Sequence, residues 1–251
     1  MKSNIKNILF YSVACIVMLV VISFASVKRA ARPVNDVEVN IETLDGNYFT
    51  DKEEVIGLLN AESTDYVLGS AVSQLDLKIL EQRVEVHPFV KDAQVYKDIK
   101  GNLIVQVKQA KPIARVFNRS GEDRYIDADG YLIPTKASQV ARVPILEFER
   151  KLGWEENITE SSYGQQLLEL LHFVDKDEFW RAQIAGMLIQ SDGEIIMQPQ
   201  VTKQEITFGM PQELDEKFRK LKLFYKEILP NKGWNTYSTV NLKFKDQIVC
   251  E

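Results

Sequence analysis

The chain has 251 residues, 45% of them hydrophobic and 27% charged, and a formal net charge of −5 at pH 7. Its first 32 residues contain five basic and no acidic side chains, so the remainder carries 26 basic against 36 acidic side chains. This acidic balance, with no basic stripe, excludes nucleic acid as an expected partner, because phosphate binding depends on clustered Lys and Arg. The length allows one or two domains with modest cores.

The run from Ile8 to Val27 contains twenty residues without a charged side chain, and twelve of them are Leu, Ile, Val or Phe. At about 1.5 Å per helical residue it spans roughly 30 Å, the hydrocarbon thickness of a bilayer. A cleaved signal peptide is the alternative, but its apolar core is usually about 7 to 15 residues long. We therefore predict a retained transmembrane helix at 8–27 after a short tail at 1–7. Basic residues flank the run almost equally, so charge alone does not set its orientation.

The segment that follows has the pattern of a small α+β domain in the order strand, helix, helix, strand, strand. Apolar and polar residues alternate in the strands, and apolar residues recur at helical spacing in the helices. Thr50 and Glu53 have the spacing of a capping box that opens the first helix, and Pro88 ends the second helix. The other expected elements are a strand at 37–41, a helix at 75–85, and strands at 90–95 and 103–107. Two helices on one face of a three-stranded sheet are predicted, within a domain at 37–116.

Residues 117–251 predict a β-rich domain with two helices. Turn residues separate short strands expected at 114–118, 124–127, 183–190, 194–198, 205–208 and 238–243. One helix is expected at 165–174 and another at 212–229. The apolar stripe of the latter consists of Leu214, Phe218, Leu221, Tyr225 and Ile228. This stripe favours a helix packed on its own sheet over a partner-binding coiled coil, because five positions are too few for a sustained zipper.

Residues suited to catalysis are sparse. The two histidines, His87 and His172, lack the second histidine four positions away that a zinc-protease helix requires. No nucleophile elbow, phosphate-binding glycine loop or Cys-x-x-Cys pair is present in the sequence. A glycosidase-type pair of carboxylates depends on a distance in space and stays open as a remote alternative. We therefore predict no catalytic residue and no cofactor.

A metal site and a disulfide are not expected either. Asp127 and Asp129 precede a glycine as in a calcium loop, but the position that should supply a bidentate Glu is Ser138. The segment therefore predicts a turn. Cys15 lies in the predicted transmembrane helix and Cys250 is the penultimate residue, so a bond between them is geometrically implausible.

Three motifs resemble the FtsQ/DivIB family of bacterial cell-division proteins. The first, His87-Pro88-Phe89-Val90-x-x-Ala93-x-Val95 with Leu103-x-Val105-x-Val107 and Pro112-Ile113-Ala114, resembles the family's POTRA domain. The second, over 127–133, resembles the turn that opens its β-rich domain, and the third, over 240–244, resembles its C-terminal strand. Gln109 and Ala110 depart from the family, which often carries an acidic and a basic residue there. No motif aligns over 137–192.

The resemblance implies a non-enzymatic protein that spans the cell inner membrane once, with both domains outside the cytoplasm. Such a protein recruits and bridges other division proteins at the septum, and its usual partners are the single-pass coiled-coil proteins FtsB and FtsL. A membrane-tethered envelope enzyme, such as a cell-wall hydrolase, is the alternative from another class. A secretion or outer-membrane assembly component is a third alternative, but it would carry several POTRA units and a barrel.

The C-terminal strands are the expected partner site, because a strand at a sheet edge can accept an extended partner segment. One of two segments, 240–244 or 248–250, is expected to form that edge. Leu242 and Phe244 should share one face of the strand, and Lys243 should lie on the other. The candidate partner-binding residues are Val240, Asn241, Leu242, Lys243, Phe244 and Ile248.

Overall fold

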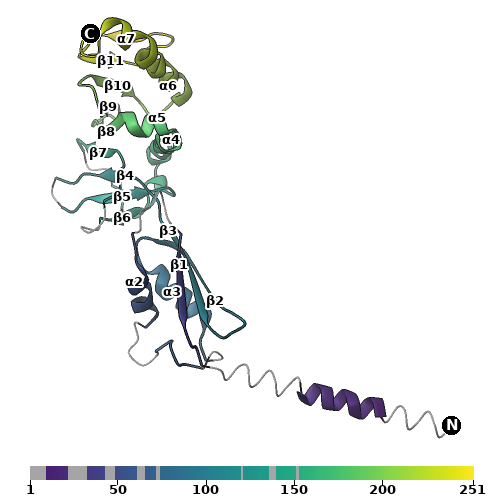
Figure 1. The fold of residues 1–251 in the computed structure, drawn as a ribbon. Helices are drawn as coiled ribbons and strands as arrows, with labels where there is room; N and C mark the ends of the chain where they lie inside the picture. Colours follow the sequence, from purple (N-terminus) through teal and green to yellow (C-terminus); the bar gives the residue numbers. More distant parts are fainter. Residues whose placement is uncertain are drawn as a thin grey trace. The chain divides into compact units, whose positions relative to one another are not determined.

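The computed structural model describes residues 10–21, 33–42, 49–60, 66–71, 74–119, 121–135, 140–150 and 153–251. The chain divides into two compact units, an N-terminal unit over Met1–Gln109 and a C-terminal unit over Ala110–Glu251 (Figure 1). Each unit has its own sheet and its own buried apolar core.

Residues 10–21 form a helix whose side chains are exposed. Among the described residues, no helix combines the length and the apolar character needed to cross a bilayer. The other residues of the predicted transmembrane segment, 8–9 and 22–27, and those of the predicted tail at 1–7 lie outside the described part of the chain.

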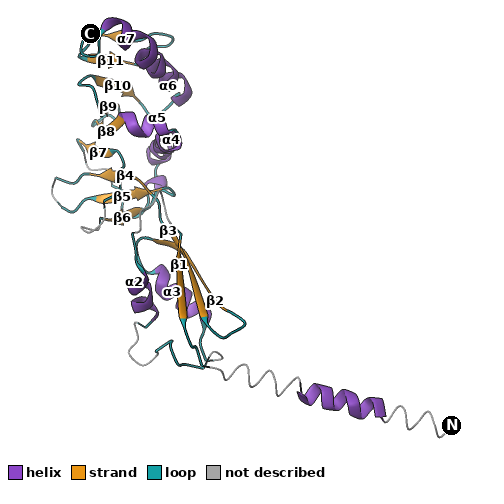
Figure 2. Ribbon diagram, in the orientation of Figure 1, coloured by secondary structure: helices purple, strands orange, loops and turns teal. Residues whose placement is uncertain are grey.

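The N-terminal unit contains the predicted α+β domain. Its elements are β1 (Val37–Ile41), α2 (Lys52–Leu59), α3 (Leu77–Glu85), β2 (Val90–Lys97) and β3 (Leu103–Gln109). In the described residues its sheet has the order β1-β3-β2, with β1 parallel and β2 antiparallel to β3. Both helices lie on the same face of the sheet (Figure 2). Apolar side chains at alternate strand positions, such as Val105 and Val107, are fully buried beneath them.

Two local details of this unit bear on the sequence analysis: the N-cap of α2 and the surroundings of Gln109. The cap of α2 is Asp51, whose side chain accepts the Glu54 N–H at 2.8 Å, so the predicted capping box of Thr50 was wrong by one residue. Gln109 is buried, and its side chain accepts the Phe49 N–H at 2.6 Å and donates to the Glu42 carbonyl at 2.7 Å. Because its side-chain amide both donates and accepts, Gln109 has a structural role at the position where this sequence departs from the family pattern.

The C-terminal unit is built on one large sheet, nine-stranded in the described residues, with the order β12-β11-β10-β9-β8-β7-β4-β5-β6. Its strands are β4 (Pro112–Val116), β5 (Arg124–Asp127), β6 (Leu132–Pro134), β7 (Ile145–Phe148), β8 (Ile184–Ile189), β9 (Ile195–Pro199), β10 (Glu205–Gly209), β11 (Thr239–Asn241) and β12 (Val249–Cys250). Because β4 pairs with β5 and β7, the boundary between the units falls before β4, earlier than the predicted residue 116.

Helices cover one face of the large sheet (Figure 2). They are α4 (Ser162–Lys176), α5 (Glu178–Gln183), α6 (Leu214–Leu223) and α7 (Leu229–Lys232), with a short 3-10 turn at Ile158–Glu160. The predicted stripe of the later helix packs into the core, since Phe218 and Leu221 are buried. A π-helical turn, Phe224–Ile228, joins α6 to α7. Pro230 lacks the N–H of an ordinary helical bond, which accounts for a shift in the hydrogen-bond pattern at this point.

Candidate partner-binding edge

The two outermost strands of the large sheet are β12 and β6. β11 lies inside the sheet, because it pairs in parallel with β10 and in antiparallel with β12. Of the two segments that the sequence offered as the edge, the outer one is therefore β12 and not 240–244. Val240 illustrates this, since it is opposite Ile206 on one side and Cys250 on the other.

In the part of the chain that the structure describes, the outer margin of β12 presents backbone groups without a hydrogen-bond partner. Thr239 and Glu251 form a doubly hydrogen-bonded pair, with N–H to carbonyl distances of 3.0 and 3.1 Å. Antiparallel pairs alternate, so the next pair, Val240 and Cys250, exchanges no hydrogen bonds. The N–H and C=O of Cys250 consequently point away from β11. An outward N–H and C=O on an edge strand can pair with another strand.

The opposite margin, at β6, is covered. The Leu132 N–H donates to the Glu156 carbonyl at 2.8 Å, and Tyr131 forms a bridge with Asn157. Pro134, the last residue of β6, has no N–H to donate. These features leave β12 as the more accessible margin of the large sheet among the described residues.

The predicted site residues have different environments. Val240 and Leu242 are completely buried in the core, whereas Phe244 is 51% exposed. The prediction that Leu242 and Phe244 share one strand face was wrong, because β11 ends at Asn241 and Phe244 lies in the following turn. Ile248 packs partly against the core.

Lys243 and Cys250 also contribute side-chain groups to this region. The Lys243 Nζ donates to the Glu194 carboxylate at 2.7 Å, so the lysine is held by the turn between β8 and β9. Burial raises the pKa of the Cys250 thiol, which therefore stays protonated at neutral pH. The site offers backbone groups and one exposed aromatic ring, which suit the binding of another chain.

The residues that could have suggested other chemistry occupy structural positions. Asp127 is confirmed as part of a turn, because its Oδ1 accepts the N–H groups of Asp129 and Tyr131 at 2.9 and 2.8 Å. His87 lies 3.7 Å from the Glu54 carboxylate, and His172 is exposed on α4. Within the described ranges, no group of three or more His, Cys, Asp or Glu could hold a metal ion.

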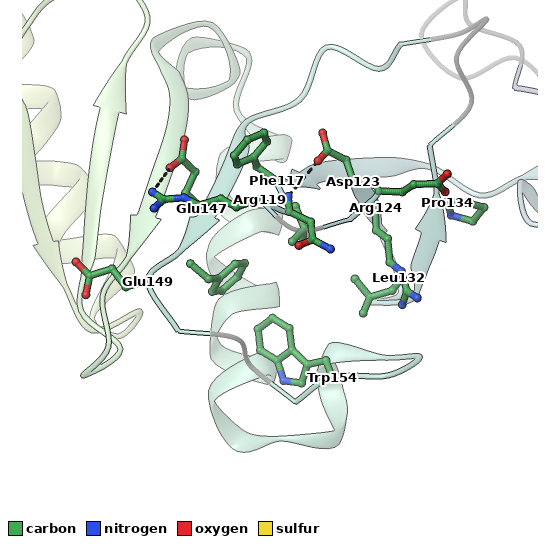
Figure 3. A pocket seen from close by; sticks show the side chains of 13 residues that line it. Phe117, Arg119, Asp123, Arg124, Leu132, Pro134, Glu147, Glu149 and Trp154 are labelled. Carbon is green, nitrogen blue, oxygen red and sulfur yellow. Dashed lines mark hydrogen bonds and ion pairs between the residues drawn. The ribbon is translucent and has the colours of Figure 1, made fainter.

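A cavity of about 710 Å³ opens on the C-terminal unit beside β4, β6 and β7 (Figure 3). Phe148 and Trp154 line it, with ring centroids 5.6 Å apart and planes at 89°. Arg119 and Glu147, both on its wall, form an ion pair at 3.6 Å. No Ser, Cys, His or Lys belongs to the described lining, so the cavity provides no nucleophile and base of the Ser–His or Cys–His kind. The lining does contain the carboxylates of Glu122, Asp123, Glu147 and Glu149, so this absence bears only on Ser–His and Cys–His chemistry and not on a glycosidase-type carboxylate pair.

Fold and site together define a two-domain protein in which a POTRA-like domain precedes a β-rich domain with an open C-terminal sheet margin. Residues 33–108 match the POTRA-like domain family, and residues 111–251 match the family described as FtsQ/DivIB, C-terminal related. The chain belongs to the FtsQ/DivIB family. It is 27% identical over 185 residues to a protein named Cell division protein FtsQ from Rhodothermus marinus, a match that covers 72% of this chain and 67% of that protein.

Proposed function

We propose that this protein is a membrane-anchored assembly protein of the bacterial division machinery and binds partners by strand addition to β12. The observation that carries the proposal is the open margin at Cys250, where a backbone N–H and C=O point outward. An extended partner segment completes such a ladder, with main-chain bonds giving affinity and side-chain contacts giving specificity. The name of the relative from Rhodothermus marinus supports a role in division.

The partners that the family resemblance implies are FtsB-like and FtsL-like single-pass coiled-coil proteins. β12 has two residues, and each net hydrogen bond contributes about 0.5–1.5 kcal/mol, so side-chain anchors must add affinity. Phe244 is the best placed anchor, because it is exposed in the turn that leads to β12. Asn241, Lys243 and Ile248 lie around the same turn, while Val240 and Leu242 support it from the core.

The transmembrane helix predicted at 8–27 compensates for the low affinity expected of such a short edge strand. Partners anchored in the same membrane are confined to two dimensions, which raises their effective concentration near β12. A short strand-addition interface then suffices for assembly at the septum. The bridging role follows, since one anchored chain offers two folded units to neighbouring chains.

A proline at Cys250 tests the proposal with little disturbance of the fold. Its ring replaces an N–H that points outward, so the bonds between β11 and β12 stay intact, and proline is tolerated at strand edges. Cys250→Ala is the matched control, because it removes the thiol and keeps the N–H. The measurement is recovery of FtsB-like and FtsL-like proteins with the full chain from crosslinked membranes.

We expect Cys250→Pro to lower recovery roughly tenfold or more, since it removes one outward bond and adds a steric block. Cys250→Ala should retain recovery. If Cys250→Pro melts like the natural chain and still recovers the same partners, strand addition at β12 is wrong. Cleavage of peptidoglycan by the purified chain would instead favour the hydrolase alternative.

A further inference from the structure

A buried lysine of α6 holds the turn between β11 and β12. The Lys220 Nζ donates to the carbonyl of Leu242 at 2.8 Å and to the carbonyl of Phe244 at 2.7 Å. The Lys220 side chain is 9% exposed. Both carbonyls have left the strand ladder, because β11 ends at Asn241. The Lys220 amine thus donates to these two carbonyls in place of the backbone N–H groups of a neighbouring strand.

Glu216, one helical turn earlier, holds the second part. Its Oε1 lies 3.4 Å from the Lys220 Nζ and accepts the Asp246 N–H at 3.3 Å. The i,i+4 pair of Glu216 and Lys220 therefore contacts three backbone groups of the segment 242–246. We name this pair of residues the turn clamp.

The turn clamp depends on one conformation of the turn. A buried ammonium is unfavourable unless its donors are satisfied, and here the acceptors are two turn carbonyls and the Glu216 carboxylate. The turn itself contains a non-glycine residue in the left-handed region, Asp246 at φ 54°. Such a residue persists when its surroundings hold it. Helix and turn thus stabilise each other.

The position of β12 depends on this turn because the strand itself is short. β12 contributes two residues to its ladder with β11, and short two-stranded ladders are marginal on their own. A displaced turn would move the outward groups of Cys250 and the exposed ring of Phe244 together. Pre-ordering these groups lowers the entropic cost of binding an extended partner.

We propose that Glu216 and Lys220 are positioning residues that hold β12 in place for strand addition. This inference rests on the proposed function of β12 and adds a control element to it, since α6 sets how ordered the binding margin is. The turn clamp acts through the turn and does not need to touch the partner.

Lys220→Met tests the inference, because methionine fills the space and has no donor. Lys217→Met is the matched control: Lys217 is also a buried lysine of α6, but its Nζ donates to the Met210 carbonyl at 2.7 Å, outside the turn. Amide hydrogen exchange of the full chain is measured over 239–251 and over β8. Partner recovery from crosslinked membranes is measured in parallel.

We expect Lys220→Met to speed exchange over 239–251 at least tenfold, to leave β8 unchanged and to lower partner recovery. Lys217→Met should leave exchange over 239–251 and recovery as in the natural chain. The inference is overturned if Lys220→Met leaves exchange unchanged, or speeds it and leaves recovery intact. Should Lys220→Met fail to fold, Glu216→Ala removes the contact to Asp246 without emptying a buried site and takes its place.

Cys250→Pro separates this inference from the proposed function. If Cys250→Pro keeps full recovery, β12 is not the partner site and the proposed function fails, whatever the turn clamp does to exchange. If Cys250→Pro abolishes recovery while Lys220→Met and Glu216→Ala preserve it, the partner site stands and the turn clamp is not required.

Discussion

At the scale of single residues, Lys243 is held by Glu194, and this pair complicates any charge substitution at the partner edge. Its Nζ to carboxylate distance is 2.7 Å, and the side chains are 40% and 25% exposed. An ion pair this exposed contributes about 0.2–1 kcal/mol. We therefore expect this ion pair to affect partner binding only slightly, by changing the position of the turn.

Charge reversal at Lys243 should weaken partner recovery by at most about fivefold, because it places a glutamate against Glu194 and loosens the turn. The double variant Lys243→Glu with Glu194→Lys restores the pair in reverse and should restore recovery. Both are measured in crosslinked membranes. A double variant as weak as the single one would instead indicate that the partner contacts Lys243 directly.

Glu216 gives the turn clamp a defined pH dependence. The Asp246 N–H holds the pKa of the Glu216 carboxyl below its ordinary value of 4.5, with help from Lys220 and Arg219 and against the effect of burial. Because the folded pKa is the lower one, this stabilisation is complete above about pH 4.5 and is lost as the pH falls through the folded value.

We expect exchange over 239–251, corrected for the intrinsic rate, to rise as the pH falls below about 4.5. Glu216→Gln has no charge to lose, so its exchange in this segment should be faster at neutral pH and lack the acid-dependent rise. Parallel pH curves for the two proteins would show that Glu216 does not control the turn.

At the scale of elements, the sequence predicted the helices and strands whose own residues show a clear apolar period. Alternating strands such as β1 and β3 and the apolar stripe of α6 lie where the pattern puts them. β7 was missed because four residues are too few to show a period. The end of β11 was missed for another reason: the carbonyls that follow it bind Lys220, a tertiary contact from α6.

The start of α4 depends on a glycine. Ser161 caps the helix through the Gly164 N–H, and a Cβ on Gly164 would lie 1.7 Å from the Ile158 carbonyl oxygen. Gly164→Ala should lower the melting temperature of the C-terminal unit by roughly 5–10 °C, since overpacking costs about 1–3 kcal/mol.

Gly57→Ala is the control for this substitution. It lies inside α2, where a Cβ meets nothing within 4 Å, so alanine should stabilise the N-terminal unit by about 0.5–1 kcal/mol. Both effects are read from thermal melts followed by circular dichroism. An unchanged melt for Gly164→Ala would mean that the turn before α4 relaxes to admit a methyl group.

At the scale of the whole molecule, the sequence located the candidate site within about ten residues but did not identify its outer strand. Strand order is set by long-range pairing: β11 pairs with β10, and β12 returns from a turn to cover β11. The family motifs predicted the two-unit organisation. The boundary between the units lies at residue 109 and not at the predicted 116, because β4 joins the large sheet. Membrane attachment stays a prediction from the apolar run at 8–27.

The hydrogen-exchange rate of the Cys250 amide reports directly on strand addition at β12. It is measured by NMR on the full chain, free and in the complex recovered with its membrane partners. We expect this outward amide to exchange rapidly in the free chain and at least tenfold more slowly in the complex, while the amide of Val249, already paired with β11, changes little. Equally rapid exchange of Cys250 in free and complexed protein would contradict strand addition at β12.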